Sequence, residues 1–169
     1  MPIDNCIHGF DELANVVLPR HFTRLQEAMC APMSTVDFVG FRSATRTALG
    51  RVDKPTDFPG CYVFLRAGTA IYVGISRGVV NRIIQHINSD THYSASLVYR
   101  MACNEHPHKM RRDEAMKHDQ FRTAFFSVQN RLREMSVAFI EIHNDLELYL
   151  FEVYAAMKLH TVLNTFRTH

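Results

Sequence analysis

The alternation of apolar and polar positions separates strand-like runs from helical ones. Residues 60–65 (GCYVFL) and 70–75 (AIYVGI) are short, aromatic and β-branched, and RAGT joins them, which is typical of a β-hairpin. Residues 136–142 (SVAFIEI) predict a third strand. Helical segments precede, separate and follow these runs. The pattern therefore predicts an α/β (α+β) fold with a small, mainly antiparallel three-stranded sheet flanked by helices.

The segment before the hairpin has the character of a helical extension. Residues 9–30 predict a helix that is broken or kinked at Pro19, because proline removes a backbone donor and crowds the preceding turn. Residues 38–50 predict a further short helix. The stretch RVDKPTDFPG then indicates a linker. We therefore expect a helical N-terminal extension over residues 1–58.

The region after the hairpin predicts helices around the third strand, within a second domain over residues 59–169. Residues 77–88 predict an amphipathic helix, and residues 89–135 predict a helical insertion of two or three pieces with a break at Pro107. An apolar helix is expected over 146–160. The apolar stripe of the amphipathic helix is formed by Val79, Val80, Ile83, Ile84 and Ile87.

One carboxylate stands out in the apolar helix 146–160. At about 100° per residue, Glu147 and Lys158 lie about 20° apart and are expected to define its solvent face. Glu152 lies about 120–140° from both, so it needs a cation, a hydrogen-bond network or a cleft. A buried ion pair and a metal ligand are both consistent with this position.

Two tyrosines and a glycine mark the hairpin. If the loop is the three-residue Arg66–Gly68 with Gly68 at φ > 0, Tyr62 faces Tyr72 directly across the strands. A two-residue loop would break that pairing. Facing tyrosines are most often a core pair, but the neighbouring Gly74 also permits the close approach of a ligand or backbone.

The helix after the hairpin carries a cation and an imidazole on one face. Arg82 and His86 are four residues apart and project together, away from the apolar stripe. Such a pair can clamp a phosphate, although an ordinary solvated helix face has the same pattern.

In order and spacing, these features resemble the GIY-YIG nuclease family. Residues 60–62 (GCY) match its first motif with cysteine where isoleucine is usual, and residues 72–74 (YVG) match its second with valine for isoleucine. The family carries an arginine in the next helix, often with a histidine one turn later, as Arg82 and His86 do here. Each match alone is weak, but an ordered series is specific.

The later motifs of the family are also matched. Its catalytic glutamate lies on a later helix, as Glu152 does, and an asparagine about a dozen residues further on corresponds to Asn164. The resemblance covers residues 60–166 and leaves most of 89–135 and all of 1–58 outside the family pattern.

The resemblance implies a metal-dependent endonuclease that hydrolyses DNA phosphodiester bonds. Glu152 would hold one divalent cation, Mg²⁺ or Mn²⁺. Arg82 would stabilise the negative charge of the transition state. Tyr62 would act as general base or orient the attacking water, which demands a lowered pKa because tyrosine ordinarily titrates near about 10.

The remaining residues would position the substrate. Tyr72 would hydrogen-bond a phosphate oxygen or the water, and His86 would donate to a phosphate oxygen or share the role of base. Gly74 would allow close approach. Asn164 would position the glutamate helix or contact the substrate.

Composition restricts the remaining possibilities. The 169 residues are 47% hydrophobic with a formal net charge of only +2, so any grip on nucleic acid must come from local clusters of charge. No apolar run approaches the roughly 20 residues that span a bilayer, and the N-terminus lacks a signal-peptide pattern. We therefore expect a soluble, intracellular (cytoplasmic) protein with no membrane partner.

Two features of the insertion have open interpretations. Cys103, His106 and His108 have a C-x2-H-x-H spacing, but the sequence offers no obvious fourth ligand, which favours a histidine-rich loop over a metal site. The basic residues around 109–112 (KMRR) form either a solvated helix face or a DNA-backbone contact surface.

Three functions remain in competition. The leading one is an active endonuclease with DNA as partner, of small restriction type, which would cut both strands as a homodimer. The second is a catalytically silent nucleic-acid-binding module of the same fold. The third is an α/β scaffold in which the motif matches are coincidental. Full occupancy of the five catalytic positions favours the first.

Overall fold

The computed structural model describes residues 2–166, except for the side chain of Arg42. Contacts divide the chain into two compact units. The first consists of Met1–Met33, Asp57–Val79 and Ser136–His169. The second consists of Ser34–Thr56 and Val80–Met135. The sequence-based division at residue 58 stays a prediction about domain organisation.

The first unit holds strands β2, β3 and β4 of the sheet and the helices that pack against them. Its elements are η1 (Ile3–Asn5), α1 (Phe10–Glu12), η2 (Leu13–Val17), α2 (Leu18–Cys30), β2 (Gly60–Arg66), β3 (Thr69–Ser76), β4 (Ser136–Glu141) and α8 (Asp145–Leu159).

The sheet has the strand order β1-β4-β2-β3, with β2 antiparallel to both of its neighbours. The three expected strands and the mixed helix–sheet architecture are confirmed. The fourth strand, β1 (Met33–Ser34), is too short to leave a period in the sequence. β3 is therefore an edge strand.

The pairing of Tyr62 with Tyr72, which was predicted only for a three-residue loop, does not form. The hairpin loop has two residues, and both Ala67 (φ 48°) and Gly68 (φ 78°) adopt positive φ, as a tight primed turn requires. In the resulting register Tyr62 faces Gly74. The three-residue loop gave positive φ to Gly68 alone, whereas Ala67 also adopts it here, a conformation that L-residues other than glycine rarely take.

A bulge completes the change of register. Phe64 pairs with Tyr72, but the next residue, Leu65, pairs with Ala70, so β3 contributes Ile71 as an extra residue. Tyr62 and Tyr72 consequently become diagonal neighbours on one sheet face. The bulge lies between the turn and the tyrosines.

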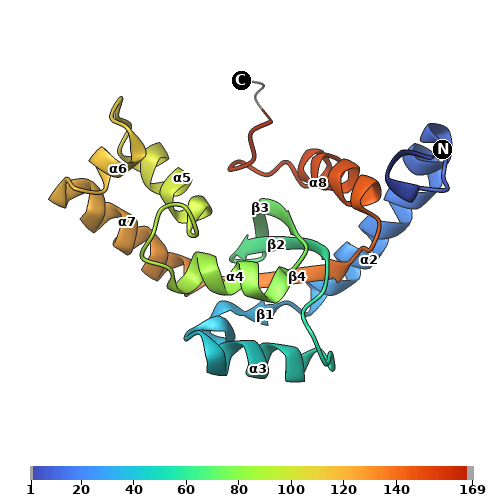
Figure 1. Cartoon of the computed structure of the whole chain (residues 1–169), viewed down its shortest axis with the longest axis horizontal. Coiled ribbons are helices and arrows are strands. Elements are labelled where there is room, and N and C mark those ends of the chain that lie inside the picture. Colours follow the sequence, from blue (N-terminus) through green and yellow to red (C-terminus); the bar gives the residue numbers. More distant parts are fainter. Residues whose placement is uncertain (1, 167–169) are drawn as a thin grey trace. The chain divides into compact units, whose positions relative to one another are not determined.

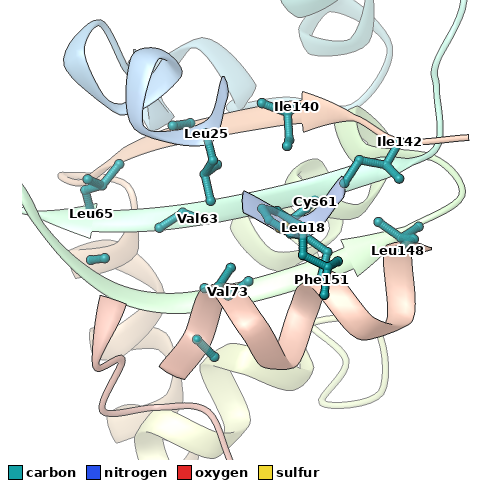
Figure 2. Close-up of a cluster of buried hydrophobic side chains, with 14 residues drawn as sticks. Leu18, Leu25, Cys61, Val63, Leu65, Val73, Ile140, Ile142, Leu148 and Phe151 are labelled. Atoms are coloured by element: carbon teal, nitrogen blue, oxygen red, sulfur yellow. The ribbon is translucent and has the colours of Figure 1, made fainter. Parts of the chain in front are cut away.

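The opposite sheet face packs against α2 and α8. Figure 2 shows Leu25 of α2, Val63 of β2, Val73 of β3 and Phe151 of α8 in one apolar cluster. In Figure 1, α2 runs alongside β4 and α8 alongside β3. Cys61 belongs to the same cluster, so successive residues of β2 alternate between the α8 side and the tyrosine side.

The α8 helix starts from a side-chain cap and has a different solvent face from the one expected. The Asn144 side chain accepts a hydrogen bond from the Glu147 backbone N–H at 3.1 Å. Glu147 does not mark the solvent face: its side chain is only 14% exposed and meets His21 at 2.8 Å. Lys158 is exposed as expected.

The helix over residues 9–30 is distorted around Pro19, as predicted. A π-helical segment, η2, precedes the proline, and the Leu18 N–H bonds back to the Leu13 carbonyl. This wider turn relieves the crowding that the proline ring causes in a regular α-helix.

The second unit is helical. Its elements are η3 (Thr35–Phe38), α3 (Arg42–Arg51), α4 (Val79–Asn88, whose first residue belongs to the first unit), α5 (Ser96–Glu105), α6 (Arg112–Ala115) and α7 (Asp119–Leu132). The predicted stripe of α4 is confirmed, since all five of its residues are at most 1% exposed. Pro107 lies between α5 and α6, where a break was expected.

Among the described helices, none combines the length and apolar character needed to cross a bilayer.

Candidate active site

Tyr62 and Tyr72 form a ring pair on the face of the sheet opposite to α8. Their ring centroids are 6.2 Å apart and their planes are inclined by 51°. Tyr62 is 1% exposed, whereas Tyr72 is half-buried. The more accessible phenol is therefore that of Tyr72.

Gly74 is the residue that makes room for this pair. A Cβ atom at this position would lie 2.5 Å from the Tyr62 hydroxyl oxygen and 2.9 Å from the Tyr72 ring. The end of the Tyr62 ring therefore lies directly over the Gly74 backbone. Gly60 plays a related role at the same open end of the hairpin, where a Cβ would clash with the Ile140 carbonyl oxygen.

Glu152 lies at the border between the buried and exposed sides of α8. Its neighbours one turn away include the buried Leu148 and Ala156 and the exposed Tyr149. Burial first, and then the negative charge of Glu152, raise the pKa of the Cys61 thiol well above its ordinary value. The carboxylate is thus half-buried close to the start of β2.

Asn164 fastens the segment after α8 to the edge of the sheet. Its side-chain oxygen accepts from the Val73 N–H at 2.9 Å, and its amide donates to the Val73 carbonyl at 2.8 Å. The Thr161 hydroxyl donates to the same oxygen at 2.8 Å, and the Leu163 N–H donates to the Ile71 carbonyl at 3.1 Å. Asn164 therefore acts as a one-residue extension of the sheet beside Val73.

In the second unit, Arg82 is tied to the start of α5. Its guanidinium donates to the Ser94 carbonyl at 2.9 Å, to the Ser96 hydroxyl at 2.7 Å and to the Gln85 side chain at 3.0 Å. The side chain is half-buried. These bonds hold the cation in one orientation.

His86 lies one turn further along α4 and is fully buried. Burial, and then the positive charges of Arg82 and Arg100, hold the pKa of His86 well below its ordinary value. The imidazole is consequently neutral near pH 7, which suits a proton acceptor or a neutral donor.

The spacing of Cys103, His106 and His108 does not produce a cluster of three ligands. The Cys103 sulfur lies 3.5 Å and the Tyr99 hydroxyl 3.3 Å from His108 Nε2, while His106 is exposed. Burial and Cys103 raise the pKa of Tyr99 to about 12. Across the described residues, no group of three His, Cys, Asp or Glu side chains is placed to hold a metal ion.

Several cations of the insertion have local partners. Arg131 pairs with Glu105 at 2.6 Å, Arg133 donates to the Ile87 carbonyl at 3.1 Å, and Arg112 lies over the Tyr99 ring. Both interpretations of this charged region therefore stand, since paired surface cations can still contact phosphates.

The sequence interpretation missed a small pocket next to Glu152. A cavity of about 160 Å³ is lined by Ile75, Ser76, Arg77, Asp145, Leu148 and Tyr149. One signal could have found it: Tyr149 is three residues before Glu152 and so shares its helix face, while residues 75–77 directly follow the YVG motif.

Comparison with known proteins gives structural likenesses only. No protein-family model and no curated protein matches the chain. One similar solved structure is the GIY-YIG N-terminal endonuclease domain of UvrC from Thermotoga maritima, described as bound to its catalytic divalent cation, magnesium. It is 19% identical, with a TM-score of 0.38, over 65% of this chain and 86% of that domain.

A point mutant of the same Thermotoga maritima domain is also similar. It is 15% identical, with a TM-score of 0.39, over 74% of this chain and 99% of that domain. The family named by both structures is the one that the sequence motifs resemble. Identities this low carry no residue's role across, so the roles below rest on this chain's own residues.

Proposed function

We propose that the protein is a metal-dependent endonuclease that hydrolyses DNA phosphodiester bonds. The observation that carries the proposal is the packing of Tyr62 over Gly74 beside Tyr72. It explains why the YVG motif ends in glycine, since any side chain at this position would overlap the Tyr62 ring. The ordered motifs that end in Glu152 and Asn164 add to it.

The donor set suits a hard divalent cation. Mg²⁺ keeps several waters and binds through one or two carboxylates together with substrate phosphate, so the half-buried Glu152 is a sufficient protein ligand. A bound Mg²⁺ or Mn²⁺ would neutralise charge on the phosphate and favour ionisation of the attacking water.

The two tyrosines act on the water and the phosphate. Tyr72, the more accessible phenol, donates a hydrogen bond to a phosphate oxygen or to the water. Tyr62, held in place over Gly74, serves as general base or orients the water. A buried and closely packed phenol loses little entropy when it acts.

We assign Arg82 and His86 to the same reaction from the order of the motifs in the sequence. Arg82 stabilises the negative charge that develops on the non-bridging oxygens. His86, neutral because its pKa is depressed, accepts a proton or donates a hydrogen bond to phosphate. Asn164 positions the segment after the glutamate helix.

Within the first unit, the substrate phosphate is expected at the outer edge of β3. The tyrosines lie on one face of the sheet and α8 packs on the other, alongside β3. A phosphate reaches both a phenol and the Glu152 carboxylate only around that edge. This placement also puts the residues after the YVG motif next to the flanking nucleotides.

We further propose that the enzyme is of small restriction type and cuts both strands as a homodimer. A silent nucleic-acid-binding module is the second candidate. The burial of Tyr62 favours it, because an enclosed phenol has limited access to a water.

Cleavage of supercoiled plasmid with and without Mg²⁺ or Mn²⁺ tests the proposal. Discrete, metal-dependent fragments are expected, and their ends would give the recognition site. Nicking or a smear would retain the nuclease but overturn the restriction type. DNA binding without cleavage would establish the silent module, and the absence of both would overturn the proposal.

A further inference from the structure

The pocket beside Glu152 combines a cation, an exposed aromatic ring and a hydroxyl. Tyr149 of α8 is 66% exposed, and Arg77 is 85% exposed. Ser76 also lines the cavity, where its hydroxyl is bonded to the Gly78 backbone, and Ile75 and Leu148 supply apolar walls. At about 160 Å³ the cavity is smaller than the pockets of about 300 Å³ or more that enclose whole drug-sized ligands, so it suits a single ring or phosphate.

The pocket continues the edge of β3 beyond the point where Asn164 covers it. Asn164 bonds to both backbone groups of Val73, which shows that the backbone groups of this residue point outward. Backbone direction alternates along a strand, so the N–H and C=O of Ile75 point to the same edge. Ile75 lines the pocket, and its backbone N–H therefore adds a donor there.

An ion pair with Asp145 holds the Arg77 guanidinium at the pocket. Arg77 donates to the Asp145 carboxylate at 2.8 Å, and both side chains are solvent-exposed. Water screens an exposed pair of this kind, so a phosphate can replace the carboxylate at little cost. Arg77 is thus positioned by Asp145 yet available to an anion.

We propose that Arg77, Tyr149 and the backbone of Ile75 form a nucleotide subsite that holds the DNA strand next to the scissile phosphate. This inference rests on the proposed function. Arg77 and the Ile75 N–H bind the flanking phosphate, and the ring of Tyr149 stacks on the adjoining base. Tyr149 and Glu152 lie one helical turn apart, which places the subsite about one nucleotide from the reaction.

A fluorescent reporter tests the subsite independently of cleavage. The chain contains no tryptophan, so Tyr149→Trp introduces a single one at the pocket. We expect a short single-stranded DNA oligonucleotide to quench its emission by stacking. The matched control is Tyr93→Trp, at a tyrosine that is 64% exposed in the second unit. Equal quenching of both variants, or none, would overturn the proposal.

Binding measurements separate stacking from general adhesion. Tyr149→Ala should weaken oligonucleotide binding at least about fivefold, whereas Tyr149→Phe, which keeps the ring, should stay within about twofold of wild type. Arg77→Gln should lower the dependence of log Kd on log salt by about one unit. Arg51→Gln, which removes an exposed arginine paired with Asp37, is the control and should leave the salt dependence unchanged.

The two proposals fail in distinguishable ways. Plasmid cleavage by the wild-type protein without selective quenching of Tyr149→Trp would remove the subsite and keep the nuclease. Selective quenching with no cleavage by the wild-type protein would remove the nuclease and keep a nucleotide-binding pocket. Circular dichroism melts of each variant exclude unfolding as the cause of either result.

Discussion

Gly74 shows how one missing side chain organises the candidate site. The Tyr62 ring packs directly on its backbone, and the Tyr72 ring borders the space that a Cβ at Gly74 would occupy. The usual conformational argument for glycine does not apply here, since Gly74 is not among the residues with positive φ. Steric room selects glycine at this position.

Replacing Gly74 tests this interpretation. Gly74→Ala should destabilise the protein by about 1–3 kcal/mol, because the new methyl group overlaps the Tyr62 ring. Gly50→Ala is the control: it lies in α3 with nothing within 4 Å of the added Cβ, and alanine should there be neutral or stabilising by up to about 1 kcal/mol. Urea unfolding measures both, and equal effects would contradict the steric account.

The buried imidazole of His86 should make the stability of the folded protein depend on pH. Burial holds its pKa well below the ordinary value of 6.5, so the unfolded chain binds a proton there that the folded protein does not. The stability from neutral His86 is therefore present above about pH 6.5 and is lost as pH falls further, by up to about 1.4 kcal/mol per unit. His21, whose pKa is also lowered by burial, adds to the same loss.

A substitution isolates this contribution. In His86→Gln, urea unfolding free energies should fall less between about pH 7.5 and 5.5 than in wild type, because the titrating group is gone. His118→Gln, at an exposed histidine, serves as control. An unchanged pH dependence in the His86 variant would mean that His86 titrates alike in the folded and unfolded chains.

At the scale of elements, long periodic segments were predictable and short ones were not. The stripe of α4 was correct because five apolar side chains must be buried together. The hairpin register assumed for a three-residue loop does not form, because the two-residue loop depends on Ala67, whose positive φ no propensity suggests. Glu147 was misplaced because its partner, His21, is distant in the sequence.

The contact between Asn164 and β3 joins two elements, and its loss should change both the stability of the protein and the exchange of a backbone amide. Asn164→Ala removes an acceptor and a donor that satisfy Val73, and should cost about 1–2 kcal/mol of stability. The Val73 amide should also exchange with deuterium faster, since the edge of the strand opens. Thr165→Ala, at the exposed neighbour, should change neither quantity. Unchanged exchange in the Asn164 variant would contradict its role at the edge.

At the scale of the whole molecule, sequence motifs identified candidate residues but not their surroundings. The order of motifs selected Tyr62, Tyr72 and Glu152. The two-residue turn, the bulge and the burial of Tyr62 are visible only in the three-dimensional structure. The pocket at Arg77 and Tyr149 also joins residues far apart in the chain. Such juxtapositions depend on strand register, which local patterns specify weakly.

The most direct test of the central claim is the rate of metal-dependent DNA cleavage by Glu152→Gln beside Glu147→Gln. Both changes neutralise one carboxylate of α8, but only Glu152 is assigned to the cation, whereas Glu147 pairs with His21. The account predicts that Glu152→Gln loses at least about 100-fold in rate while remaining folded, and that Glu147→Gln still cuts. Cleavage by Glu152→Gln at the wild-type rate would contradict it.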